Sequence, residues 1–390
     1  MQQKDVAINR RNPLRATGTA RRAKLIERVA TEPAMTTTTT AQTPARAAYL
    51  VLGMHRSGTS AITQVLALAG ADLPQNVMTG DEHNAKGYFE PWKIAILNDG
   101  RLRAAGAAWD DVFAFPYRPL APKAERSWLN RAETLVEEEF GAAPFPLLKD
   151  PRVTVLLPFW RTVLADLEIG ARCVIPVRHP LAVAGSLARR NGFAPEKSVL
   201  LWTAYMLAAE AYTRDLPRAF VSYDGLLDDW RGEVARIEAA HGAALPKLDD
   251  KAAKAIGKFL TPELRHNAGA GGLAALGWAG ALASKVYDGF EAAAATGAAP
   301  DATALDAAAK ALADRRREIG VLVSPVTRDL DATRADLLDL RQLHDFERGQ
   351  MAQERDAHRA EVRRLEREIE ALKREAADAV FHLDAILADS

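Results

Sequence analysis

Short apolar runs separated by helical stretches dominate the first two thirds of the chain. The run from Ala47 to Leu52 predicts a fully buried strand that leads into Gly53. Later apolar runs lie at 146–148, 173–177 and 220–221, with helical stretches such as 153–167 and 198–212 between them. This alternation predicts an α/β fold with a parallel sheet flanked by helices, in which ligands bind beyond the carboxyl ends of the strands.

The pattern changes after Asn267. Residues 268–312 are rich in Ala and Gly and poor in large apolar side chains, which predicts loosely packed helices or a linker. A heptad repeat follows, and it is most regular over the last three heptads. Its two seams are Leu330, Leu337, His344, Met351, His358, Leu365, Leu372, Ala379 and Ile386, and Val362, Ile369, Ala376 and Leu383.

Arg341, Arg348 and Arg355 interrupt the second seam, so a charged, solvent-exposed single helix remains the alternative for 330–360. The pattern over 362–386 predicts a coiled coil, and hence a homo-oligomer or a partner helix.

Composition narrows the classes of partner. The 390 residues contain 51 basic and 51 acidic side chains, so net charge favours neither a nucleic acid nor an anionic membrane, and any anion site must be local. The single cysteine, Cys173, excludes an intramolecular disulfide and a multi-cysteine metal site, and we expect a small buried thiol in a reducing, cytoplasmic compartment. No apolar run reaches 18 residues, which predicts no transmembrane segment.

The first 34 residues carry eight basic and three acidic side chains with no apolar segment behind them, so we expect a disordered arm rather than a signal peptide. Met35, which precedes a Thr run, is a candidate for the true start of translation.

The segment Gly53-Met54-His55-Arg56-Ser57-Gly58-Thr59-Ser60 stands between the first strand and a helix. A glycine-containing turn at a helix N-terminus brings backbone N–H groups and a partial positive charge to an anion. Its spacing is similar to the nucleotide-hydrolase loop G-x-x-x-x-G-K-[ST], but Thr59 stands at the lysine position. The loop therefore lacks the usual reach to a β- or γ-phosphate, and Arg56 supplies a cation beside a shorter anionic group.

A second anion-binding pattern follows the strand at 173–177. Arg178 comes directly after this strand, Pro180 fits a first helical turn, and Ser186 lies eight residues beyond Arg178. Arg and Ser together can bind the oxygens of a dianionic phosphate.

These two patterns, together with Lys149-Asp150-Pro151, resemble the sulfotransferases that use 3′-phosphoadenosine 5′-phosphosulfate (PAPS), especially their bacterial branch with its P-loop-like fold. The resemblance implies that Arg178 and Ser186 bind the 3′-phosphate and that Lys149 contacts the leaving phosphosulfate. Lys149 and Asp150 could instead form a surface ion pair. Tyr223 resembles the family's tyrosine near the adenosine, and half-buried core is an equal alternative. The loop residues that would hold the 5′-phosphosulfate are Arg56, Ser57, Gly58, Thr59 and Ser60.

The resemblance also implies a carboxylate base after the loop and its helix. We select Glu90, because Tyr88 and Phe89 could partly desolvate it. Glu82 and His83 remain alternatives. Trp109 could contact an acceptor, with a core role as its alternative.

The predicted organisation is an N-terminal arm (1–46), a sulfotransferase domain (47–267), an Ala/Gly-rich helical linker (268–328) and a coiled-coil tail (329–390). The implied reaction moves the sulfuryl group from PAPS to a hydroxyl, on a glycan or glycolipid, by in-line transfer, with Glu90, Lys149 and Arg56 as catalytic groups and no metal. A kinase or NTPase and a non-catalytic coiled-coil scaffold are the alternatives.

Overall fold

The computed structural model describes residues 46–78, 80, 87–261 and 272–388, without the side chains of 343, 346 and 378–388. By its contacts the chain divides into two units, Met1–Thr43 and Pro44–Ser390, and all described residues belong to the second. Glu82 and His83, the alternative bases, lie outside the described residues.

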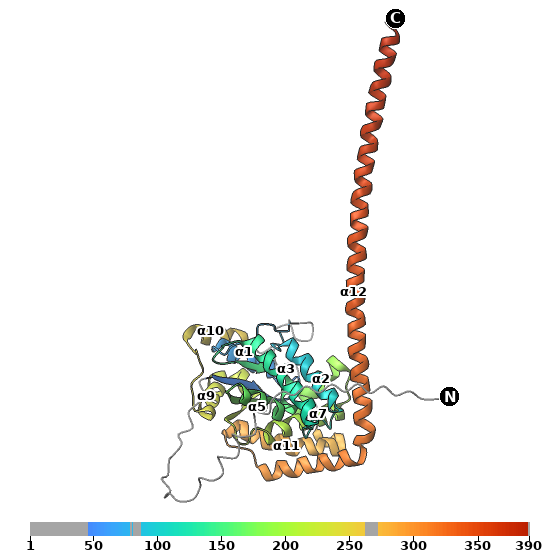
Figure 1. Ribbon diagram of the computed structural model, residues 1–390. Helices are drawn as coiled ribbons and strands as arrows, with labels where there is room; N and C mark the ends of the chain where they lie inside the picture. The colour runs from blue at the N-terminus through green and yellow to red at the C-terminus, as the bar shows by residue number, and fades with distance from the viewer. Residues whose placement is uncertain (1–45, 79, 81–86, 262–271, 389–390) are drawn as a thin grey trace, which may run out of the picture. The chain divides into compact units, whose positions relative to one another are not determined.

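Four parallel strands form one sheet in the order β2-β1-β3-β4. Figure 1 shows the helices that surround this sheet and the long C-terminal helix α12. They are β1 (Arg46–Val51), β2 (Leu147–Lys149), β3 (Ile169–Val177) and β4 (Arg218–Ser222). Tyr49 lies opposite Leu147 on one side and Arg172 on the other, which fixes the register of β1 with β2 and with β3. The predicted α/β class is confirmed, and all four strands end at the same edge of the sheet.

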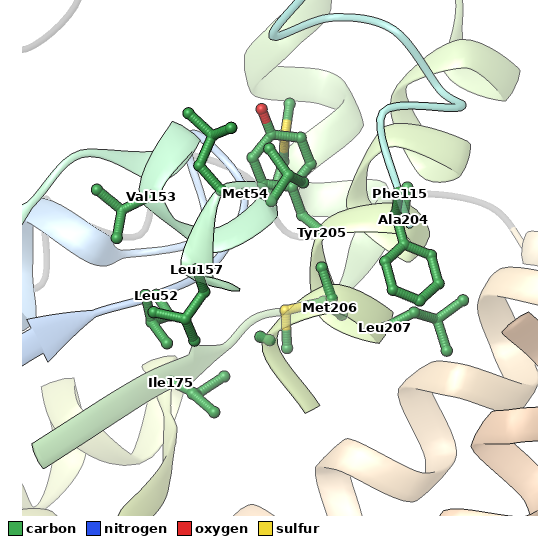
Figure 2. Packing of buried hydrophobic residues seen from close by; sticks show 14 of the residues in the cluster. Leu52, Met54, Phe115, Val153, Leu157, Ile175, Ala204, Tyr205, Met206 and Leu207 are labelled. Carbon is green, nitrogen blue, oxygen red and sulfur yellow. The ribbon is translucent and has the colours of Figure 1, made fainter. Parts of the chain in front are cut away.

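Helices cover both faces because successive side chains of each strand point to opposite sides. Tyr49 and Val51 pack in one apolar cluster with helices α1, α9 and α10, while Leu50 packs in the other with α4, α5, α7 and α11. Figure 2 shows the second cluster beside the sheet, where Leu52 and Ile175 meet side chains from α4 and α5. The strands are buried on both faces, as their unbroken apolar runs predict.

The helices alternate with the strands along the chain. In order they are α1 (Thr59–Leu68), α2 (Trp92–Ala104), α3 (Pro122–Phe140), α4 (Pro151–Val155), α5 (Leu157–Asp166), α6 (Pro180–Asn191), α7 (Pro195–Ala211), α8 (Tyr223–Asp228), α9 (Trp230–His241), α10 (Asp250–Phe259), the 3₁₀ helix η2 (Leu273–Leu276), α11 (Gly277–Thr296) and α12 (Ala302–Ala388). The helix expected over 153–167 is two helices, because the chain turns at Leu156.

Helix α11 differs from the expected loose helix or linker. Leu282, Val286 and Phe290 are buried in the main core, and Phe290 meets Phe220 of β4 with ring centroids 5.5 Å apart. Small alanines between these residues allow close approach, so a helix with few large apolar side chains still packs tightly. The α/β unit therefore extends past residue 267, where the sequence placed its end.

Helix α12 contains Pro325 and is assigned as helix through residue 329, the expected start of the coiled-coil tail. Its first part packs on the α/β unit through Leu305, Ala308 and Leu312, and farther along Ser324, Thr327 and Asp331 are buried. From 335 to 376 every described side chain is exposed or half-buried. The helical tail is confirmed, whereas its coiled-coil pairing stays a prediction.

Two expectations from composition bear on the described residues. Cys173 is buried, and burial raises the pKa of its thiol to about 12, as expected for an unreactive core cysteine. None of the helices within the described ranges is long and apolar enough to cross a membrane.

Candidate functional site

The segment 53–60 forms a tight loop from β1 into α1. Three of its residues have positive φ, with Gly53 at 145°, Arg56 at 70° and Gly58 at 93°. Glycine adopts this region freely, whereas a left-handed arginine costs about 1–2 kcal/mol and needs support from its surroundings. Left-handed residues at a helix N-terminus give the backbone a concave shape that suits an anion.

The two anion-binding patterns of the sequence meet in space. Arg56 Nε donates to Ser186 Oγ at 2.7 Å, although the two residues are 130 positions apart. Arg178 Nη1 donates to the carbonyl of Arg56 at 2.9 Å, which supports the left-handed backbone there. The ends of β1 and β3 thus present their cations to one site.

Tyr223 supports both patterns from the end of β4. The guanidinium carbon of Arg178 lies 4.3 Å from the centroid of its ring. A Cβ on Gly58 would come within 2.3 Å of the same ring, so no larger residue fits there without movement. Tyr223 is also buried in an apolar cluster and therefore contributes to the core. Its contact with adenosine stays a prediction.

Lys149, the last residue of β2, is only 1% exposed and extends toward the loop. Its Nζ donates to Glu90 Oε1 at 2.5 Å, to the carbonyl of Tyr88 at 3.0 Å and to Ser60 Oγ at 3.3 Å. Glu90 is 4% exposed. Lys149 therefore forms a buried ion pair with Glu90, and the alternative of a surface pair with Asp150 is wrong.

Asp150 is part of a neighbouring network around Arg152. It accepts from Arg152 Nη1 at 3.0 Å and from Asn98 Nδ2 at 2.8 Å, and it caps α4. Arg152 also donates to Asp99 at 2.5 Å and lies 3.9 Å from Glu90 Oε2. Both carboxylate oxygens of Glu90 thus face a cation. The aromatic neighbours that single out Glu90 in the sequence give no sign of these two cations.

Two polar side chains of the loop are buried without a partner among the described residues. They are Ser57, through its hydroxyl, and His55, through Nε2. Burial lowers the pKa of His55 well below its usual range, and nearby Arg190, Arg152, Lys149 and Arg56 lower it further. His55 is therefore neutral at pH 7, and the loop offers an unused hydroxyl donor.

The site has an excess of positive charge. Arg178 has no carboxylate partner among the described residues, and burial lowers the pKa of its guanidinium. Burial also lowers the pKa of Arg190, and the neighbouring charge of Arg56 adds to the shift. Asp224 offsets only part of this effect at Arg178, and Glu90 only part of it at Arg190, so a bound anion would favour both charged side chains.

An aromatic rim links the loop to α12. Trp109 lies edge-on to His55, at 4.8 Å between ring centroids, and stacks on Phe193 at 5.9 Å. The adjacent Asp110 is buried and accepts from Lys197 at 2.9 Å and from Arg334 of α12 at 3.2 Å. The C-terminal helix therefore touches the border of the site.

The structure brings every described candidate to one edge of the sheet. The candidates are Arg56, Ser57, Gly58, Thr59, Ser60, Glu90, Lys149, Arg178, Ser186 and Tyr223. Sequence reasoning missed His55 and Arg152. A signal existed for both, since His55 lies inside the loop and Arg152 follows Lys149 by three residues. None of the His, Cys, Asp and Glu side chains in the described ranges group in threes that could hold a metal ion.

Comparison with solved structures finds matches at low identity, and two sulfotransferase domains are among them. No protein family and no curated protein matches the sequence. The sulfotransferase domain of the Synechococcus PCC 7002 olefin synthase aligns at 15% identity and a TM-score of 0.33, covering 70% of this chain and 96% of that one. A sulfotransferase domain of the curacin biosynthetic pathway aligns at 14% identity and a TM-score of 0.33, covering 54% and 77%.

Proposed function

We propose that this protein is a sulfotransferase that uses PAPS as sulfuryl donor and a hydroxyl group as acceptor. The observation that carries the proposal is the contact of Arg56 with Ser186 at 2.7 Å, which joins the loop proposed to hold the 5′-phosphosulfate to the proposed 3′-phosphate anchor. An ATP or GTP site needs no second anchor of this kind. The proposal rests on this pairing and on the buried cations around it, rather than on overall similarity to other proteins.

The residues present fit PAPS on three counts. Gly58 and the left-handed loop give an anion concavity, and the buried Ser57 hydroxyl has no described partner. Arg178 is a buried cation without a described carboxylate, in contact with the loop backbone. In the proposal Arg56, Ser57, Gly58, Thr59 and Ser60 hold the phosphosulfate, Arg178 and Ser186 the 3′-phosphate, and Tyr223 the adenosine side.

PAPS supplies a sulfuryl group whose transfer yields a sulfated acceptor, 3′-phosphoadenosine 5′-phosphate and one proton. Glu90 accepts the proton of the acceptor hydroxyl, while Lys149 and Arg56 neutralise charge on the departing phosphate oxygen. In the present structure Lys149 Nζ is bonded to Glu90. The base is free to act only when Lys149 turns toward phosphate, so donor binding would prepare the carboxylate. Arg152 keeps Glu90 in place through this change.

The acceptor is proposed to be a carbohydrate hydroxyl on a glycan or glycolipid. The half-exposed Trp109 beside the loop supports this choice, because aromatic faces suit sugar rings. Phenols and peptides are the alternative acceptors.

The test combines binding with transfer. Calorimetry should show binding of 3′,5′-adenosine bisphosphate that is at least about tenfold tighter than binding of ATP or GTP, because only the bisphosphate occupies both anchors. Transfer of labelled sulfate from PAPS onto a panel of glycans, phenols and peptides then identifies the acceptor class. Preference for ATP or GTP would refute the proposal, and binding without any transfer would favour a scaffold.

A further inference from the structure

Helix α12 shows two different faces where it crosses the α/β unit. Ser324, Thr327 and Asp331 are buried on one face, and Arg334 on that face pairs with Asp110. At 100° per residue, a second face centred near Val326 lies about 115° away around the helix. This second face is apolar and exposed, with Leu322 at 69% and Val326 at 67%.

The exposed apolar face continues along the helix as one stripe. Eleven large apolar side chains fall within an arc of about 120°. They are Ile319, Leu322, Val326, Leu330, Leu337, Leu340, Met351, Val362, Leu365, Ile369 and Leu372, and all are exposed. Val321 and Leu338 are exposed but lie outside the arc. The stripe therefore begins eleven residues before the first heptad position found in the sequence, Leu330.

Two rows of charged side chains with a seven-residue spacing accompany the stripe: the acidic row follows one edge of it, and the basic row occupies positions of the second seam. The acidic row is Glu347, Glu354, Glu361, Glu368 and Glu375, and the basic row is Arg334, Arg341, Arg348 and Arg355. In a parallel pair of helices in register, Arg348 of one copy lies beside Glu347 of the other, and Arg355 beside Glu354. An antiparallel pair would instead set acidic row against acidic row. The charge pattern of α12 therefore favours a parallel pair of two copies over an antiparallel pair.

We propose that α12 binds α12 of a second copy of this chain, parallel and in register, along the whole stripe from Ile319 to Leu372. The proximal part of the stripe lies where the opposite face of the helix is bound to the α/β unit. Pairing there holds two α/β units at the same end of the dimer, each on the outer side of its own helix.

The size of the contact suits a stable dimer. The 53 steps from Ile319 to Leu372 span about 80 Å at 1.5 Å per residue. With a contact width of about 10 Å, two such stripes bury about 1,600 Å² in total, the standard size of a specific interface. Pairing with α12 of a second copy therefore buries enough surface for a specific dimer.

Sedimentation equilibrium on the full-length protein tests the proposal without reference to activity, so its outcome is independent of the proposed function. Wild type should have twice the mass of the 42.3 kDa chain at micromolar concentration. The double variant Leu322→Glu/Val326→Glu should raise the dimer dissociation constant about a hundredfold or more. Val321→Glu, at a 75% exposed position outside the arc, is the matched control and should change it by less than about twofold.

Cross-linking tests the orientation. The native Cys173 is buried, so Leu337→Cys adds one accessible thiol per chain. Mild oxidation should link two copies through identical positions, whereas an antiparallel pair along the whole stripe would set residue 337 opposite residue 354 and would not link. A monomeric wild type, a dimer unaffected by the Leu322/Val326 variant, or a Leu337→Cys dimer that does not cross-link would each overturn the proposal.

Discussion

Replacing Lys149 by Met tests stability and catalysis at the same position. The substitution keeps an unbranched side chain of similar volume and removes the charge that faces Glu90 at 2.5 Å. Removing one partner of a buried ion pair costs about 3–5 kcal/mol, because the other charge remains buried and unpaired. Arg152, at 3.9 Å from Glu90, offsets part of this cost, so we expect a loss of about 3 kcal/mol in the free energy of unfolding.

The same substitution should lower kcat by about two to three orders of magnitude, with a smaller change in donor affinity, because it removes a preorganised cation from the transition state. The double variant Lys149→Met/Glu90→Gln leaves no buried charge alone. It should recover to within about 1 kcal/mol of wild-type stability while turnover stays low.

Urea unfolding gives the stabilities, and sulfate transfer from saturating PAPS gives kcat. The matched control is Lys93→Met, since Lys93 forms a 3.1 Å ion pair with Glu138 in which both side chains are substantially exposed. This control should cost less than about 1 kcal/mol and leave kcat unchanged. Near-normal turnover of Lys149→Met would refute the catalytic role, and unchanged stability would refute the energetic reasoning.

Three further perturbations probe the anchors and the loop. Arg178→Ala should weaken binding of 3′,5′-adenosine bisphosphate about ten- to a hundredfold and binding of adenosine 5′-phosphosulfate much less; equal losses by calorimetry would contradict the 3′-phosphate assignment. Gly58→Ala should lower the melting temperature and abolish binding of the bisphosphate, because its Cβ meets the ring of Tyr223. The control Gly106→Ala, also at positive φ but with open space around it, should leave binding intact. Equal affinity of the two variants for the bisphosphate would refute this reasoning. His55 has a folded pKa below its unfolded value, so the unfolded chain gains a proton first and stability falls as pH drops below about 6.5. His55→Gln should therefore lose less stability between pH 7 and pH 5 in urea unfolding, and parallel curves for variant and wild type would exclude this linkage.

Much of the fold follows from local sequence signals. Apolar runs near Tyr49, Leu148 and Ile175 locate the strands, because a strand buried on both faces has no polar positions. Polar residues directly after these runs predict a ligand-binding site, since the carboxyl ends of parallel strands lie at the same edge of the sheet. Arg178 and Ser186 could be paired from their sequence spacing because both lie in the segment that leads from β3 into α6.

Other features depend on contacts that no local pattern records. Glu90 pairs with Lys149 across 59 positions, and its second cation, Arg152, comes from the helix after β2. The sequence did not reveal the packing of α11, because the helix has few large apolar side chains and its alanines permit a close approach that no local pattern records. The distinction between the two faces of α12 near Val326 likewise required knowing which face the α/β unit covers.

The separation of Arg56 from Ser186 has a consequence for how the chain folds. The two residues meet only after β1 has paired with β3, and Tyr223 joins them only after β4 has been added. Such non-local pairing is slow compared with helix formation. During synthesis the complete arrangement of Arg56, Ser186 and Tyr223 cannot form before residue 223 has left the ribosome. A ligand of this site therefore binds only the assembled sheet, and at a hundred times its dissociation constant it would stabilise the native protein by about 2.7 kcal/mol.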